Sequence, residues 1–417
     1  MTAAGYFDSP WPAEDGGPQR LQVPRRGGGL GLRRGGRLRC TSRRTLLSTM
    51  TVLGAPGEVY LLTHSALRSH AGLPTTACVE WVDPHTLRTL QRSPRLAGGP
   101  MWPGGLALHR NGSLIAVYGR WAHRLSRRCE PLAARQLPVD EPYNSFVVLD
   151  NGLVVTKNLS TSTPARLSTL EPERLESVAA DVECPEPSVA RLSASGNTVY
   201  VVGVRSIFRY RWDDTRQRLQ RDEGWRHDYL GTLGQSHGWD VVLAGGQAWF
   251  MDNGAHRYRW RMHGAGVART ANRLLRVALD DVGDAQAQTV CGLPGGSITN
   301  PPLVDTARQI VVGYDSANAV LQAWRFDAAA RTLAPLWRKA PFGCASHMLL
   351  YPDSGELVIN DHRRFGEEVV VLDICSGEEL GRVRPGGLMQ GVVFPSPGWE
   401  RDLYWSSMDR LTRVYVE

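Results

Sequence analysis

The chain has 417 residues, of which 42% are hydrophobic and 21% are charged. This length exceeds the roughly 100–200 residues of one ordinary globular core, so we expect either several domains or a repeat architecture. No stretch reaches the roughly 18–20 consecutive apolar residues that a membrane helix needs, and we therefore expect no membrane partner.

The net charge of +7 is concentrated near the N-terminus. Residues 1–50 contain nine arginines against the acidic residues Asp8, Glu14 and Asp15, which accounts for all but one of the excess positive charges. The rest of the chain carries no general attraction for phosphate, so we expect no nucleic acid to bind the folded domain.

Residues 1–45 are rich in Gly, Pro and Arg and show no apolar periodicity, which predicts a disordered tail. Within this segment, Ser42-Arg43-Arg44 is similar to a twin-arginine export motif. The apolar stretch that follows, Leu46–Ala55, is short and interrupted by polar residues. We therefore predict a cytoplasmic protein, with export as the alternative.

Seven cysteines are scattered singly, with no CxxC pair and no metal-ligand spacing. Such an odd and dispersed set suits reduced thiols in the cytoplasm better than a disulfide framework.

From about residue 104, a short apolar strand, a tight turn and a second apolar strand recur. The pattern opens at Gly104 and returns at intervals of 40 to 62 residues, at Asn144, Ser188, Gly238, Asn300, Ser346 and Gln390. Its turns contain Asn-Gly, Ser-Gly and Gly-Gly, which supply the positive φ angles that β-hairpins need. Hairpins at this spacing, with no helical period between them, predict an all-β fold of the β-propeller type.

Counting the openings, together with an earlier partial unit at Glu58–Gln91, predicts eight four-stranded blades, with seven as the alternative. The last unit has room for only three strands, and a ring must close to remove its open edges. We therefore expect a strand from residues near 38–50 to complete it. In domain terms, the sequence predicts a tail over 1–45 and a single propeller over 46–417.

A second hairpin completes most units and is clearest at Val369–Arg382, where Leu372-Asp373 is followed by Ser376-Gly377. This hairpin resembles the repeat of the quinoprotein-type (PQQ-like) and YVTN-like propeller superfamily, in which Leu-Asp-x-x-Ser/Thr-Gly forms the outer-strand turn. The resemblance covers about residues 55–417 as architecture. The large quinoprotein dehydrogenases use adjacent cysteines and calcium-ligating carboxylates around the cofactor. No Cys-Cys pair exists here, so PQQ is not expected.

In a propeller, the ends of the second strands and the residues that lead into the first strands meet at one mouth of the central channel. Three histidines and one carboxylate in this register are candidates for acid–base chemistry or metal binding: His237, His347, His362 and Asp361. Three basic side chains on consecutive blades could hold an anion: Arg120, Lys157 and Arg205. Further ligand-binding candidates are Asn144, Asn300, Asp252, Asn253 and Gln390.

No cofactor follows from these residues alone. A divalent metal such as calcium is possible, because Asn300, Asp252 and Asp361 could stand in for ligands of lactonase-type propellers, although a matching inner-strand Glu is missing.

Two functions remain open at this point. The first is binding of a small polar or anionic molecule at the channel mouth, with acid–base or metal-assisted chemistry of a hydrolase or lyase type. The alternative is a non-catalytic scaffold for a protein partner. Fold analogy does not choose between the two.

Overall fold

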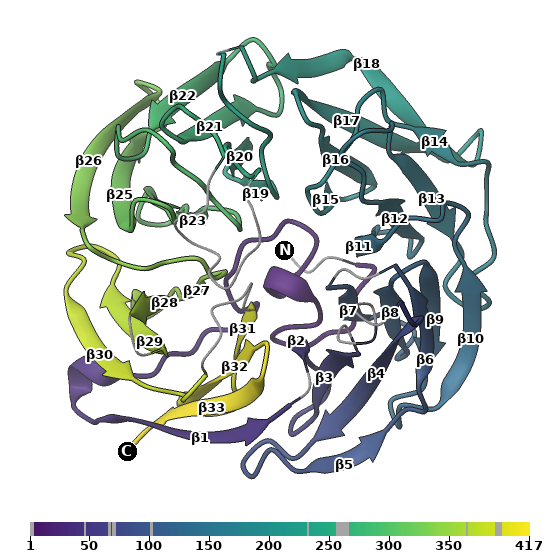
Figure 1. The fold of residues 1–417 in the computed structure, drawn as a ribbon, viewed down its shortest axis with the longest axis horizontal. Coiled ribbons are helices and arrows are strands. Elements are labelled where there is room, and N and C mark those ends of the chain that lie inside the picture. The colour runs from purple at the N-terminus through teal and green to yellow at the C-terminus, as the bar shows by residue number, and fades with distance from the viewer. Residues whose placement is uncertain are drawn as a thin grey trace.

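A computed structural model describes residues 4–45, 47–65, 68, 72–100, 103–231, 233–255, 267–363, 366–387 and 394–417. Its strands form eight antiparallel sheets that surround a central axis as the blades of a propeller (Figure 1). The predicted all-β fold and the count of eight blades are therefore confirmed. No helix among the described residues is long and apolar enough to cross a membrane.

In blades 1 to 7 the chain runs from the axis to the rim, so the first strand of each is innermost, and in blade 8 the innermost strand is β31. Blades 1 to 4 comprise the following strands. Blade 1 holds β2 (Ser48–Leu53), β3 (Val59–His64), β4 (Thr75–Val82) and β5 (Thr89–Arg92), with β6 (Leu96–Gly99) also pairing with β4. Blade 2 holds β7 (Gly105–Leu108), β8 (Leu114–Tyr118), β9 (Trp121–Leu125) and β10 (Pro131–Gln136). Blade 3 holds β11 (Tyr143–Val148), β12 (Val154–Asn158), β13 (Arg166–Leu170) and β14 (Val182–Glu183). Blade 4 holds β15 (Ser193–Ser195), β16 (Thr198–Val202), β17 (Ser206–Asp213) and β18 (Arg218–Asp228).

Blades 5 to 8 continue the same plan around the ring. Blade 5 holds β19 (Val242–Ala244), β20 (Gln247–Met251), β21 (Arg273–Ala278) and β22 (Ala285–Thr289). Blade 6 holds β23 (Leu303–Asp305), β24 (Ile310–Asp315), β25 (Val320–Asp327) and β26 (Thr332–Lys339). Blade 7 holds β27 (Leu349–Tyr351), β28 (Glu356–Arg363), β29 (Gly366–Asp373) and β30 (Glu379–Val383). Blade 8 holds β31 (Phe394–Pro397), β32 (Asp402–Ser407), β33 (Arg410–Val416) and, outermost, β1 (Leu38–Arg44).

Blade 8 joins the two ends of the described chain. Strand β1 pairs antiparallel with β33, from Leu38 opposite Val416 to Arg44 opposite Arg410. This pairing supplies the closing strand that the sequence predicts near residues 38–50, and it removes the open edge that β33 would otherwise present.

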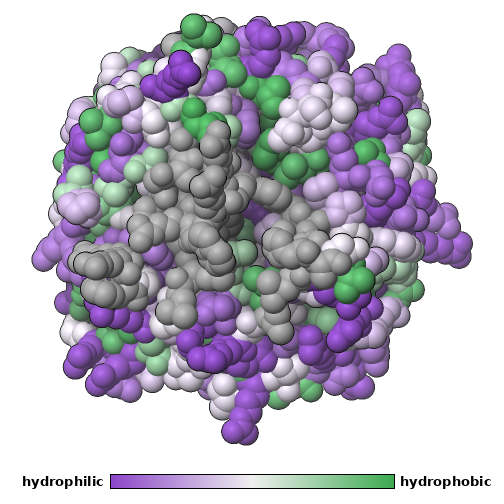
Figure 2. Space-filling model, viewed as in Figure 1, coloured by the Kyte–Doolittle hydropathy of each residue, from purple (hydrophilic) through white to green (hydrophobic). Residues whose placement is uncertain are grey.

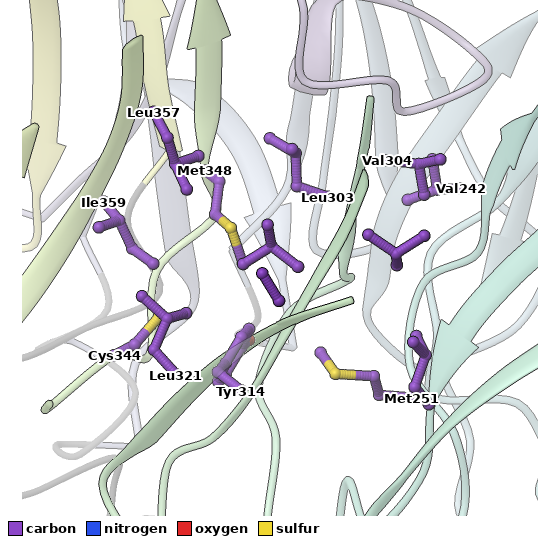
Figure 3. Close-up of a cluster of buried hydrophobic side chains, with 14 of the residues drawn as sticks. Val242, Met251, Leu303, Val304, Tyr314, Leu321, Cys344, Met348, Leu357 and Ile359 are labelled. Carbon is purple, nitrogen blue, oxygen red and sulfur yellow. The ribbon is translucent and has the colours of Figure 1, made fainter. Parts of the chain in front are cut away.

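The hydrophobic core lies between neighbouring blades, where the faces of two sheets pack together. Figure 3 shows one such region, in which Met251 of blade 5 and Tyr314 of blade 6 lie near Met348 of blade 7. All three side chains are fully buried. The strands follow each other through tight turns, and Gly112 and Gly152 at two of these turns have φ angles of 82° and 94°, which glycine adopts without strain.

The N-terminal segment occupies the central channel instead of forming a disordered tail (Figure 1). Its residues 4–30 include a short 3₁₀ turn, η1 (Glu14–Gly16), and we call them the plug. Tyr6 and Ala13 form β-bridges to His109 and Ala107 of blade 2. Along the plug, main-chain oxygens accept hydrogen bonds from inner-strand amides of blades 1, 4, 5 and 7: Leu53, Ala194, Leu243 and Leu350.

The disordered tail predicted for residues 1–45 therefore does not hold for the described residues 4–45. The physical reason is that the inner strands leave unpaired main-chain groups facing the axis, and the plug supplies partners for them. Composition alone does not reveal such partners. Beyond the plug, a second 3₁₀ turn, η2 (Leu32–Arg34), lies on the way to β1 at the rim.

Candidate functional site

Most of the predicted site residues at the ends of second strands are held by their own blade. Asp252 accepts hydrogen bonds from the main-chain amide and Nε of Arg273, at 2.6 and 2.8 Å. Burial raises the pKa of Asp252 to about 6 even though Arg273 acts to lower it. Asp361 accepts a hydrogen bond from the amide of Gly343 at 2.9 Å and pairs with Arg382 at 2.8 Å. These carboxylates fix loops and outer strands.

The predicted amides have similar structural contacts. Asn253 accepts a hydrogen bond from the amide of Ser236 and donates one to the carbonyl of Thr270. Asn144 donates to the carbonyl of Val189 in the linker to blade 4, and Asn300 donates to that of Ala345 in the linker to blade 7. Asn144 and Asn300 thereby connect neighbouring blades.

The predicted anion-binding trio is not brought together. Arg120 is paired with Asp140 at 3.0 Å and with nearby carbonyls. Arg205 is exposed, and its main-chain amide donates a hydrogen bond to Glu186. Lys157 is fully buried and donates to the carbonyl of Ser188 at 3.1 Å. Burial lowers the pKa of Lys157 to about 7.

The three predicted histidines have different environments. His237 and His362 are half-buried, on blades 5 and 7. His347 is completely buried beside the axis, where its ring stacks on Phe394 with centroids 4.0 Å apart. Gln390 lies outside the described residues. Of the four candidate catalytic residues, only His347 therefore belongs to the axial charge network described next.

The axial network joins the plug to the blades through buried charges. Arg20 NH1 lies 2.9 Å from both Glu14 Oε1 and Asp15 Oδ2. Arg191 NH1 lies 3.1 Å from Glu14 Oε1, and Nδ1 of His347 lies 2.8 Å from Asp15 Oδ1. Burial acts to raise the pKa of Asp15, but His347 and Arg20 outweigh it and hold that pKa below its usual range.

Sequence reasoning missed most of this network, namely Glu14, Asp15, Arg20, Arg191 and Asp240. A signal existed for two of them. Arg191, Asp240 and His347 each stand two residues before the first strand of their blade, and this position points to the axis. The plug residues carried no such signal because their segment has no repeat.

A second polar site lies where the ring closes, between β1 of blade 8 and strands β3 to β5 of blade 1. It is a cavity of about 540 Å³, which we call the arginine pocket. Five arginines line it, with Glu80 as the single carboxylate among its lining residues. These arginines are Arg43, Arg44, Arg68, Arg92 and Arg95. Five hydroxyl side chains complete the lining: Thr45, Thr63, Ser65, Thr76 and Thr89.

The arginines of this pocket differ in how far they are already neutralised. Arg43 places NH1 and NH2 each 3.0 Å from Glu80 Oε2, and Arg92 lies 3.7 Å from the same carboxylate. Arg44 and Arg95 are exposed and make no ion pair with the described part of the chain. His64 adds no charge at neutral pH, because burial lowers its pKa to about 4. The pocket therefore carries a clear excess of positive charge.

Comparison with known proteins identifies the architecture only. No family model and no curated protein matches the sequence. Among solved structures, a quinohemoprotein alcohol dehydrogenase from Comamonas testosteroni matches with a TM-score of 0.65 at 10% identity, covering 99% of this chain and 81% of that one. A europium-containing methanol dehydrogenase matches with a TM-score of 0.64 at 10% identity, covering 96% and 90%.

Structural similarity also extends to propellers of other kinds. BamB from Moraxella catarrhalis matches with a TM-score of 0.56 at 12% identity, covering 90% of this chain and 98% of that one. The quinoprotein-like propeller fold that the sequence resembles is thereby confirmed. At these identities the similarity shows the fold alone.

The described residues do not fit PQQ or calcium, the two groups that the family resemblances imply. For PQQ, all seven cysteines are free and none is adjacent to another in sequence. For calcium, the expected ligands Asn300, Asp252 and Asp361 lie on different blades and are bound by other groups, as described above.

Proposed function

We propose that this protein is a binding module for a small, multiply charged oxyanion, such as a phosphorylated or diphosphate-bearing molecule, which it holds in the arginine pocket. The observation that carries the proposal is the concentration of five arginines against one carboxylate around a cavity of about 540 Å³. The anionic ligand expected from the sequence is kept, while its place moves from the channel mouth to the junction of blades 8 and 1.

The side chains suit oxyanions chemically. A guanidinium group presents a planar fork of donors that matches phosphate and carboxylate oxygens, and it stays charged at all physiological pH values. A single oxygen of Glu80, Oε2, accepts hydrogen bonds from both NH1 and NH2 of Arg43, so this arginine is already oriented before a ligand arrives. Hydroxyl groups such as Thr45 and Ser65 can add neutral hydrogen bonds.

The size and position of the pocket favour a compact ligand. Its volume falls within the roughly 300–1,000 Å³ of small-molecule sites. Its lining residues include no Phe, Tyr or Trp on which a base could stack, so charge recognition dominates. We propose binding without a catalytic step.

The scaffold alternative has less support from this structure. Large apolar side chains that are exposed lie on separate elements, such as Leu90 on β5 and Leu132 on β10. The coloured part of the face in Figure 2 is largely hydrophilic toward its periphery, with hydrophobic residues in small groups. A protein interface of ordinary size usually has a more continuous apolar centre.

Isothermal titration calorimetry with pyrophosphate as the probe tests the proposal. The double variant Arg44→Ala/Arg95→Ala removes the two arginines that pair with no described residue, so the fold should be unaffected. Because each charge-assisted hydrogen bond contributes about 1.5–3 kcal/mol, we expect Kd to rise at least about tenfold. Binding should also weaken as salt is raised, since screening acts on exposed charges.

The matched control is Arg128→Ala/Arg174→Ala, which removes the same charge from exposed positions on blades 2 and 3. It should bind pyrophosphate as the wild type does. If the wild type binds no pyrophosphate at low ionic strength, or if both double variants lose affinity equally, the arginine pocket is not an anion site.

A further inference from the structure

Three acidic or imidazole side chains converge inside the channel, apart from the arginine pocket. Glu14 comes from the plug, Asp240 from the start of blade 5 and His347 from the start of blade 7. One potential ligand atom of each lies within 4.8 Å of the others. Their exposed fractions are 8%, 0% and 0%, so bulk water does not solvate them.

Polar atoms in this cluster lack partners. Asp240 Oδ2 and both ring nitrogens of His347 are buried without a hydrogen bond. The nearest guanidinium nitrogen to Asp240 Oδ2 is NH1 of Arg191, at 3.9 Å, which is beyond hydrogen-bond reach. Buried polar atoms nearly always have a partner, and leaving one unsatisfied costs on the order of 1–3 kcal/mol in general. The unpaired atoms therefore indicate a missing partner.

The surroundings of His347 resemble those of a metal-bound imidazole. Its Nδ1 lies at ion-pair distance from Asp15 Oδ1, 2.8 Å, although the two atoms do not align as a hydrogen bond, and we assign Nε2 as the nitrogen for the metal. Histidine ligands of metals usually direct their second nitrogen at a carboxylate or carbonyl, which fixes the ring. Asp240 is also oriented, because its Oδ1 accepts a hydrogen bond from the amide of Arg191 at 2.7 Å.

The charges around the cluster leave room for a cation. The network contains three carboxylates (Glu14, Asp15 and Asp240) and two guanidinium groups (Arg20 and Arg191). Arg20 and Arg191 contact Glu14 Oε1 at 2.9 and 3.1 Å and thereby orient this carboxylate. With His347 neutral, as a metal ligand must be, these groups leave one negative charge. The buried Lys157, which interacts with Asp240, is the remaining basic side chain, and burial lowers its pKa to about 7.

We infer that Glu14, Asp240 and His347 form a binding site for a divalent transition-metal ion of the zinc class, which fastens the plug to blades 5 and 7. One imidazole with two carboxylates is a ligand set that zinc accepts. Calcium prefers six to eight oxygen ligands, which this cluster does not offer. The site is structural, because it is closed from solvent by the plug.

Metal analysis of the purified full-length chain tests the inference. We expect about one equivalent of zinc after dialysis against buffered zinc, and none after chelation with 1,10-phenanthroline. Chelation should lower the Tm by about 3 °C, the shift expected when a ligand at a hundred times its Kd is removed from a chain of this length.

The variants His347→Gln and Asp240→Asn should each lose the bound zinc and the chelator response. His85→Ala, at an exposed histidine in a blade 1 turn, is the control and should retain both. Should the variants fail to fold, the wild-type metal content and its chelator-dependent Tm still decide the question. The inference is overturned if the wild type binds less than about a tenth of an equivalent of zinc. It is also overturned if neither zinc nor the chelator changes the Tm of the wild type.

Discussion

Glu367 on β29 is a carboxylate that folding places among neutral donors. It is buried and accepts hydrogen bonds from Nδ2 of Asn360 at 3.0 Å and from Nε1 of Trp405 at 3.3 Å. Burial raises the pKa of Glu367 to about 7. In the unfolded chain the same group has a pKa near 4.3, so the unfolded state releases this proton first as pH rises.

The contribution of Glu367 to the free energy of unfolding is therefore greatest below about pH 4.5, and it falls as pH rises toward 7. In the wild type this loss of stability is on the order of 3 kcal/mol between pH 4.5 and 8, and it is absent in Glu367→Gln. We expect the Tm of the variant, relative to the wild type, to be higher at pH 8 than at pH 5. Differential scanning fluorimetry across this range measures the difference.

Glu378→Gln, in an exposed turn of the same blade, is the control and should follow the wild-type pH curve. A constant Tm difference between Glu367→Gln and wild type over the range would show that Glu367 is ionised at neutral pH in the folded protein.

At the scale of elements, the segment that leads from the plug to β1 is fastened to blade 7 by two carboxylates, Asp373, which pairs with Arg33, and Glu356. Glu356, at the start of β28, accepts hydrogen bonds from the amides of Leu30, Gly31 and Leu32 at 2.7, 3.1 and 2.7 Å. Gly31 has a φ of 69°, which turns successive amides toward one point. Consecutive amides arranged in this way form a concave site for an anion, here a side chain of the same protein.

Glu356→Ala should leave these amides without their acceptor, at about 1–3 kcal/mol for each amide that stays buried. We expect a lower Tm and faster amide hydrogen exchange at Leu30–Leu32, measured by mass spectrometry. Glu183→Ala, whose exposed carboxylate pairs only loosely with Arg166 at 3.7 Å, is the comparison and should change neither. Unchanged exchange at Leu30–Leu32 in Glu356→Ala would mean that other contacts hold the segment.

At the scale of the whole molecule, the ring depends on the pairing of β1 with β33. Cys40 of β1 lies opposite Val414 of β33, and both belong to the same hydrophobic cluster. Cross-strand partners in an antiparallel pair have Cα atoms about 4.5–5.5 Å apart, within the range that a disulfide spans.

Val414→Cys should consequently form a disulfide with Cys40 under oxidising conditions. Because this bond would close a loop of most of the chain, we expect it to stabilise the ring by a few kcal/mol, about 2–4, if native geometry is kept. The measurement compares the Tm of the oxidised and reduced forms of the same variant. Cys40→Ser/Val414→Cys cannot form the bond, so its Tm should not respond to oxidant. If the oxidised and reduced forms have the same Tm, unfolding does not begin with separation of β1 from β33.

The sequence predicted the ring because each blade repeats the same local chemistry. Turns such as Asn111-Gly112 and the apolar strands beside them carry their own signals, so their spacing revealed eight units. The plug carried no comparable signal, since its Gly, Pro and Arg residues are ordered only by inner-strand groups far away in sequence.

The candidate sites were predictable only in part for the same reason. His347 was found because it precedes an inner strand, while its neighbours Glu14 and Asp15 come from the plug. The arginine pocket depends on Arg43 and Arg44 facing Arg92 and Arg95, and this juxtaposition follows from the pairing of β1 with the C-terminal strand. Local patterns contain no information on such a long-range contact.

Blade 8, which combines β1 with β31 to β33, also determines when the protein can finish folding. A ribosome makes β1 before and β33 after the other strands of the propeller, so β1 must wait for its partner until blades 1 to 7 have been synthesised. Throughout this time the inner strands lack their final arrangement around the plug, and unpaired strand edges favour aggregation. Blades 1 to 7 can form as the chain emerges, but the circle is sealed only after synthesis of Arg410–Val416. A change that delays the pairing of Arg410–Val416 with β1 should thus reduce the yield of native protein more than a loop substitution at the rim.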